Sequence, residues 1–248
     1  MNNSPCRNIL AIAKRELGGY FASPVAYVFI VIFLLLAGFF TFMLGRLFER
    51  GESSLYWFFF WHPWLYLFLV PAVGMRMWSE ERRLGTMELL LTMPITAWQA
   101  IVGKFLASWI FLFLALLLTF PVILTVNYLG HPDNGVILCG YVASFMLAGA
   151  YLAVSAMTSA MTRNQVVSFI ISVVICLFLI LAGWPPVTDL LRANFPKLVG
   201  LVAAFSVIPH FDNFQKGLLD VRDIAFFFSI IGFCLFTTGV ILRSLRAG

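Results

Sequence analysis

The sequence predicts an all-α membrane protein built as one transmembrane domain over residues 1–248. Hydrophobic residues make up 62% of the chain and charged residues 11%, whereas soluble domains are about 45–50% apolar and about 25% charged. Long apolar runs recur along the chain, and basic residues flank them as topology determinants do. These observations exclude a soluble globular domain and a disordered chain, and the net charge of +5 does not indicate a nucleic-acid partner.

The first expected element is an N-terminal amphipathic helix over residues 7–21, ahead of the first apolar run. Its charged residues fall largely away from its apolar ones, which recur at helical spacing. This pattern is typical of a helix that lies on the membrane surface. The apolar positions are Ile9, Ile12, Ala13, Leu17 and Phe21.

Six apolar runs follow, and each approaches the length of about 20 residues that a helix needs to cross a bilayer. We expect spans at 25–45, 57–77, 101–126, 136–161, 166–184 and 224–242. Six spans place both termini on one side of the membrane. With the N-terminus inside, the inner side carries ten Lys and Arg residues and the outer side six. The positive-inside rule therefore predicts cytoplasmic N- and C-termini.

The segment 79–94, between the second and third spans, carries dense charges of both signs and then an apolar run. Ser79 is a candidate N-cap, Thr86 with Glu88 could begin a second helical turn, and Pro94 ends the segment. The composition fits two structures equally. One is a short amphipathic helix parallel to the inner surface, and the other is a solvated loop that fixes the topology.

The fourth span carries a stripe of small residues spaced four, three and four apart, which predicts close helix packing. The stripe consists of Gly149, Ala153, Ala156 and Ala160. A long outer segment, 185–223, precedes the last span, and its apolar stretch 198–209 is too short to cross. We expect this stretch to be re-entrant or interfacial, and a structured outer cap without a ligand is the alternative for the whole segment.

No pattern for catalysis, cofactor binding or metal binding emerges from the sequence. H-E-x-x-H, G-x-S-x-G and Walker A motifs are absent, and the four cysteines are isolated. The histidines His62, His131 and His210 lie at span ends or in outer loops, as polar interface residues do. Lys104 lies close to the inner boundary, from which it can reach water. The central portions of the six runs carry no ionisable residue that could bind a coupling proton or sodium ion. Any energy for transport is therefore expected to come from another chain.

Two segments resemble a known family. Residues 80–95, EERRLGTMELLLTMPI, resemble the loop after the second helix in ABC-2-type ABC transporter permeases. The similarity is closest to the branch that holds the gliding-motility permeases and the copper-processing permease of nitrous-oxide reductase. Residues 210–223, HFDNFQKGLLDVRD, resemble the segment before the last helix in the gliding-type members. The surface helix, the six spans and the length agree with the family over nearly the whole chain.

The resemblance implies a permease subunit of an ATP-driven transporter in a bacterial inner membrane, and it implies that this transporter is an exporter. Such permeases work as dimers with a second copy or a related subunit, and a separate cytoplasmic ATPase binds the ATP and magnesium. The chain itself would then be no enzyme and would hold no cofactor or metal. In the gliding-type branch, an accessory membrane protein with a large outer domain often accompanies the permease.

The resemblance also assigns roles to residues. Segment 79–94 would be a coupling helix that docks on the ATPase through Glu80, Glu81, Arg82, Arg83, Thr86 and Glu88. The outer segment would cap the pathway and would include His210, Phe211, Asp212, Phe214, Lys216, Asp220, Arg222 and Asp223. Two other functions stay open: an ATPase-coupled membrane scaffold of an envelope machine that moves no substrate and, with less support, an intramembrane enzyme.

Overall fold

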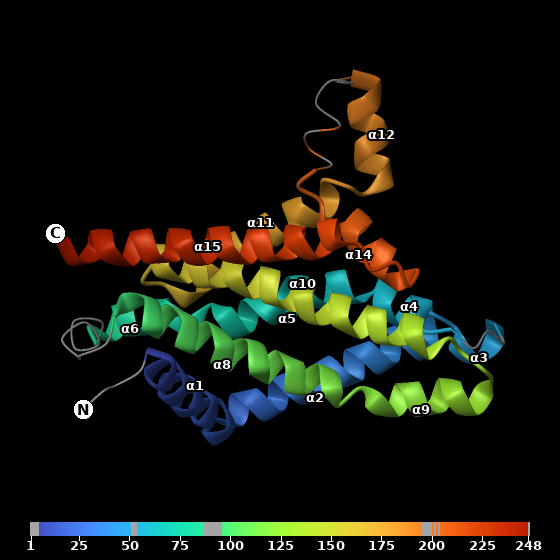
Figure 1. The fold of residues 1–248 in the computed structure, drawn as a ribbon, viewed down its shortest axis with the longest axis horizontal. Coiled ribbons are helices and arrows are strands. Elements are labelled where there is room, and N and C mark those ends of the chain that lie inside the picture. Colours follow the sequence, from blue (N-terminus) through green and yellow to red (C-terminus); the bar gives the residue numbers. More distant parts are fainter. Residues whose placement is uncertain are drawn as a thin grey trace.

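A computed structural model of the protein describes residues 5–50, 54–86, 96–194, 200, 202 and 204–247, and these residues form helices and no strand. Figure 1 shows an elongated bundle in which most helices run along the long axis. In chain order the helices are α1 (Pro5–Ala22), α2 (Pro24–Phe39), the π-helical turn η1 (Phe40–Leu44), α3 (Leu47–Arg50), α4 (Tyr56–Phe60), α5 (His62–Gly74), α6 (Arg76–Leu84), α8 (Ala97–Leu117), α9 (Phe120–Leu129), α10 (Asn134–Met161), α11 (Gln165–Leu181), α12 (Pro185–Asn194), α14 (Val207–Gln215) and α15 (Val221–Ala247).

Four helical stretches of the described chain are long and apolar enough to cross a membrane, and they overlap the expected first, third, fourth and sixth spans. The stretches are Pro24–Glu49, Ala97–Leu129, Asn134–Met161 and Val221–Ser244. The expected second span is divided among α4, α5 and α6, with breaks at Trp61 and Met75. Pro63 lies in the first turn of α5, where its missing N–H leaves no helical bond unmade. The expected fifth span is α11, which has 17 residues.

The two ends of the bundle carry different elements (Figure 1). The start of α1, the end of α6, the start of α8 and the end of α15 lie at one end, which we call the α6 end. The elements α3, α4 and α14 lie toward the opposite end, the α14 end. The first and last described helices therefore begin and finish at the same end of the bundle.

Helix α10 is the centre of the bundle, and it packs against α4, α5, α6, α8, α11, α14 and α15. In its most apolar window 67% of the residues are buried, against 22%, 33% and 28% in the other three helices of spanning length. A helix that is apolar on all sides belongs in the interior. The stripe of small residues lies on this helix, and all four of its members are buried: Gly149, Ala153, Ala156 and Ala160.

Gly149 lets α10 approach α8 closely. A Cβ at this position would stand 2.7 Å from Cε2 of Trp109. That ring is held in place by Phe145, on which it stacks at 4.3 Å and to whose carbonyl its Nε1 donates at 2.9 Å. The close approach that the spacing of small residues predicts is therefore realised between α10 and α8 at this position.

We expect Gly149→Ala to destabilise the protein by about 1–3 kcal/mol, because the added methyl group overpacks the Trp109 ring. The matched control is Gly232→Ala in α15, where a Cβ meets nothing within 4 Å. That change should be neutral or stabilising by up to about 1 kcal/mol, since alanine favours a helix over glycine. Thermal unfolding in detergent measures both variants. Equal unfolding temperatures for the two would contradict the close packing of α8 on α10.

The N-terminal helix α1 packs on α8 through the face that its apolar spacing predicts. Ile12 is buried, and a Cβ at Gly103 of α8 would stand 2.8 Å from Cγ2 of Ile12. At the other end of α1, the Tyr20 and Ser108 hydroxyls are 2.9 Å apart, and the Tyr20 ring stacks on Phe111 at 5.1 Å. Helix α1 is therefore fastened to a helix of spanning length along its whole described course.

His62 differs from the interface residue that the sequence suggested, because it is fully buried at the start of α5. Its ring packs edge-on against Phe33, Phe58 and Tyr66. Its Nδ1 lies 2.8 Å from the carbonyl oxygen of Phe58. The histidine is thus part of an aromatic cluster that joins α2, α4 and α5.

The outer segment contains α12, which projects away from the bundle, and α14, which packs on α10, α11 and α15 (Figure 1). In the expected re-entrant stretch 198–209, residues 198, 199, 201 and 203 lie outside the described residues. Its last three residues form the first turn of α14, which begins after the N-cap Ser206.

Candidate functional site

The charged cluster expected on a separate surface helix lies instead on α6, which continues the second expected span. Ser79, expected as an N-cap, is buried inside α6, and its hydroxyl donates to the carbonyl of Met75. The local sequence cannot distinguish an N-cap serine from a serine inside a helix. A serine followed by glutamates is favoured at a helix start and is also accommodated within a helix.

The break between α5 and α6 is held by Ser159 of α10. Its hydroxyl accepts hydrogen bonds from the backbone N–H groups of Trp78 and Ser79, both at 3.0 Å, and donates to the Met75 carbonyl at 2.9 Å. A side chain inserted into the helical hydrogen-bond ladder is a known cause of a kink. The start of α6 is therefore positioned by α10, and Trp78 is almost fully buried there.

Helix α6 ends at Leu84, so the described part of the segment 79–94 begins as a helix and is interrupted at Gly85. Gly85 adopts a left-handed conformation with φ 70°, and the Thr86 N–H donates to the Glu81 carbonyl at 3.1 Å. This bond and the left-handed glycine form a Schellman cap. The remaining residues 87–95, with the predicted coupling residue Glu88, lie outside the described residues.

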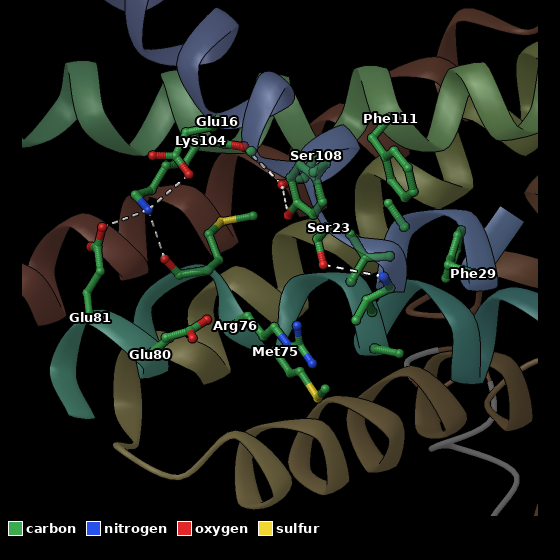
Figure 2. Close-up of a pocket in the computed structure, with 17 residues that line it drawn as sticks. Glu16, Ser23, Phe29, Met75, Arg76, Glu80, Glu81, Lys104, Ser108 and Phe111 are labelled. Atoms are coloured by element: carbon green, nitrogen blue, oxygen red, sulfur yellow. Dashed lines mark hydrogen bonds and ion pairs between the residues drawn. The ribbon is translucent and has the colours of Figure 1, made fainter. Parts of the chain in front are cut away.

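Lys104 of α8 joins three helices at this end (Figure 2). Its Nζ lies 2.9 Å from Glu81 of α6 and 3.5 Å from Glu16 of α1, and it donates to the Met77 carbonyl at 3.3 Å. The ammonium group also lies 5.3 Å from the ring centre of Trp78. Only 7% of the lysine side chain is exposed, so it does not reach water as the sequence suggested. The carboxylates stabilise the buried charge instead.

Arg82 ties α6 to the end of α10. Its Nη1 donates to the carbonyl oxygen of Ala160, in the last turn of that helix. A cation is favoured at this position by the helix dipole.

The structure thus divides the predicted coupling residues into two groups. Glu81 and Arg82 face the bundle and hold α6 against α8 and α10. Arg83 and Thr86 are exposed at the tip, where Leu84 is 62% exposed, and Glu80 is half-buried. Arg83 makes no hydrogen bond or ion pair with a described residue, and none of the described residues covers its side chain.

The predicted outer residues also fall into two groups, of which one is centred on the buried Asp223 of α15. Its two carboxylate oxygens bind His210 Nδ1 at 2.6 Å and Asn213 Nδ2 at 3.0 Å. The His210 ring stacks on Phe226 at 4.0 Å, and Phe211 and Phe214 are fully buried on the same helix. These contacts fix α14 against the start of α15.

The second group of outer residues lies at the turn between α14 and α15. The Asp220 carboxylate accepts the Arg222 N–H at 2.9 Å, and the Arg222 side chain is exposed. Partial burial raises the pKa of the Asp212 carboxyl, and the nearby Lys216 partly offsets this effect. Gly217 turns the chain with φ 77°, a conformation that favours glycine.

We expect Asp223→Ala to loosen α14 by about 1–3 kcal/mol, because it leaves His210 and Asn213 without their buried acceptor. Amide hydrogen exchange should speed up in α14 while α10 stays protected. The control is Asp189→Ala in α12, where the carboxylate is 71% exposed. Unchanged exchange in α14 would show that the carboxylate does not hold this helix.

Among the described residues, no group of three or more His, Cys, Asp or Glu side chains could hold a metal ion. The described cysteines are unpaired thiols, namely Cys6, Cys139, Cys176 and Cys234.

The sequence model of a family described as ABC-2 family transporter protein matches residues 64–241, well over half of the chain. The matched region runs from α5 to α15 and includes α6, the central helix and the outer segment. No curated protein matches the chain.

Proposed function

Because this chain belongs to the ABC-2 family of transporter proteins, the membrane components of ABC transporters, we propose that it is the permease subunit of an ATP-driven exporter. In this proposal a separate cytoplasmic ATPase docks at the α6 end. The observation that supports it is the exposed tip of α6, at Arg83, Leu84 and Thr86, on a helix that is otherwise tied to the bundle.

The proposed topology has six crossings with both termini in the cytoplasm of a bacterium and the α6 end at the inner side of its inner membrane. The second crossing combines α4, α5 and α6, and the fifth is α11. The excess of basic residues expected inside supports this orientation. We propose further that the protein works as a dimer, with a second copy or a related subunit. The branch resemblance adds an accessory chain with an outer domain as an expected partner.

The bonds at the α6 end suggest how motion would pass from the ATPase into the membrane. Ser159 and Arg82 connect α6 with α10, and Lys104 connects it with α8 and α1. A push on the tip would therefore move these helices together, as a rigid body, between inward and outward states. The outer contacts of Asp223 lie at the opposite end and would respond last.

We expect Arg83→Glu to weaken ATPase docking about tenfold, because it reverses an exposed charge at the tip. The fold should be unaffected, since Arg83 contacts no described residue by a hydrogen bond or ion pair. The control is Arg192→Glu in α12, where the side chain is 71% exposed. Co-purification with the ATPase chain, at matched membrane expression, measures the effect. Equal losses in both variants, or none in Arg83→Glu, would place docking elsewhere.

The proposal itself is tested by a pull-down of the tagged protein from its native membrane in gentle detergent. We expect a stoichiometric chain with Walker motifs, whose ATPase activity rises with substrate. An ATPase that never responds to any transported compound would favour the scaffold function. A protein that co-purifies only with itself would contradict the transporter proposal.

A further inference from the structure

A cavity of about 480 Å³ lies between α1, α2, α5, α6 and α8. This volume falls within the range of about 300–1,000 Å³ that is typical of ligand pockets. Figure 2 shows charged side chains at one end, including Glu80, Glu81 and Lys104, and the rings of Phe29 and Phe111 at the other. The pocket is therefore amphipathic along its length.

At the charged end of the cavity, several polar and charged groups have no hydrogen-bond or ion-pair partner among the described residues. Lys104 is satisfied by Glu16 and Glu81, but the second carboxylate oxygen of Glu81, Oε2, is buried without a hydrogen-bond partner among the described residues. Arg76 and Glu80 also line the cavity, and neither forms a hydrogen bond or an ion pair with a described residue. An unused buried acceptor is unfavourable, so a ligand that donates a hydrogen bond there would be stabilised.

The charges at this end select among ligands. Three carboxylates face two cations, so a purely anionic ligand would meet more repulsion than attraction. A ligand with both an anionic and a cationic group fits better. The Arg76 guanidinium suits a phosphate, and Glu80 with Glu81 Oε2 suits a primary ammonium that can donate hydrogen bonds.

The apolar end leads toward the lipid. Ala26 and Phe29 of α2 line the cavity, and so does Val25, which is 52% exposed. Val25 continues into the exposed apolar face of α2, with Val28 and Ile32. In a bilayer this face would contact acyl chains, since α2 belongs to a helical stretch of spanning length. The cavity thus joins a polar site to the hydrocarbon region.

We propose that this cavity binds a phospholipid whose headgroup carries a phosphate and a primary ammonium. The phosphate pairs with Arg76, and the ammonium donates to Glu80 and to Oε2 of Glu81. The upper part of one acyl chain lies against the rings of Phe29 and Phe111, which contact each other at 5.4 Å and form the apolar wall of the cavity. A bound lipid stabilises the arrangement of α2 and α6 around it. The proposal does not depend on the ATPase or on transport.

Lipid retention by the full-length purified protein tests this site. The protein is delipidated in detergent, mixed with equal amounts of phosphatidylethanolamine, phosphatidylcholine and phosphatidylglycerol, and analysed by native mass spectrometry. Phosphatidylethanolamine should be retained at least about tenfold better than the other two, which lack a primary ammonium. Glu80→Gln should remove this preference, because it weakens the site that accepts hydrogen bonds from the ammonium. Arg76→Ala should instead lower the retention of all three lipids, because each carries the phosphate that Arg76 binds. Arg163→Ala, an exposed basic residue outside the cavity lining, should preserve it.

Each of the following results would overturn the proposal: equal retention of the ethanolamine and choline lipids, a preference that survives in Glu80→Gln, unchanged retention of all three lipids in Arg76→Ala, or a preference reduced in Arg163→Ala as much as in Glu80→Gln. A competition experiment with soluble glycerophosphoethanolamine tests whether the acyl chains contribute to binding. If it competes as well as the intact lipid at equal concentration, the apolar end contributes nothing and the lipid is the wrong ligand. Thermal unfolding without lipid checks that the variants fold, since neither replaced side chain bonds to a described residue.

Discussion

Lys104→Met is expected to separate ATP hydrolysis from transport and to lower the stability of the protein. The change leaves Glu16 and Glu81 facing each other without the cation that both contact. Breaking a fully buried ion pair costs about 3–5 kcal/mol, and since these carboxylates are partly exposed we expect about 2–3 kcal/mol. Helices α1 and α6 would then no longer be joined through α8.

A rescue variant separates the two effects. Lys104→Met combined with Glu16→Gln and Glu81→Gln removes the unpaired charges, so the unfolding temperature should recover while the charged link stays absent. We expect basal ATPase activity of the complex to persist and substrate stimulation to stay low. Lys216→Met at the α14 end is the control. Full stimulation in the triple variant would mean that the lysine serves stability alone.

Ser159→Ala is expected to disturb the start of α6. Among the serines whose hydrogen bonds the structure describes, we expect its replacement to have the largest effect there. It leaves the N–H groups of Trp78 and Ser79 without their acceptor in a buried place. Each such group costs about 1–3 kcal/mol, so for the two groups together we expect a loss of about 2–6 kcal/mol. Hydrogen exchange at the backbone of Trp78 and Ser79 should rise, and coupling should fall with it.

Ser244→Ala is the matched control for this change. Among the described contacts, its hydroxyl donates only to the carbonyl of Ile241 in the same helix, α15. The Ser244 side chain is exposed. This variant should behave as the unmodified protein does. If Ser159→Ala unfolds at the same temperature as the control, then Ser159 does not hold the α5–α6 break.

The parts of the fold that the sequence predicts are those set by local periodicity. The apolar spacing of residues 7–21 identifies the face of α1 that packs on α8, and the small-residue spacing identifies four positions of α10 that are buried. Of the six expected spans, four are helices of spanning length among the described residues, whereas the second is divided among three helices and the fifth has 17 residues. Periodicity and hydropathy are properties of neighbouring residues, so they need no knowledge of the tertiary fold.

The parts that the sequence does not predict depend on distant residues. Lys104 has its acidic partners on two other helices, α1 and α6, and nothing in the spacing of these residues indicates that they meet. Ser79 has the local sequence pattern of an N-cap, but it lies inside α6. Its backbone N–H donates to the hydroxyl of Ser159, which is 80 residues further along the chain. Helix propensity gives way to tertiary packing at this break.

The central claim is that an ATPase docks at the tip of α6, and site-specific photocrosslinking tests it most directly. A photoreactive amino acid replaces Leu84 at the tip, which is 62% exposed, or Leu218 after α14, which is 59% exposed. In native membranes we expect Leu84 to capture a chain with nucleotide-binding motifs and Leu218 to capture none. Capture of that chain from Leu218 and not from Leu84 would contradict the account.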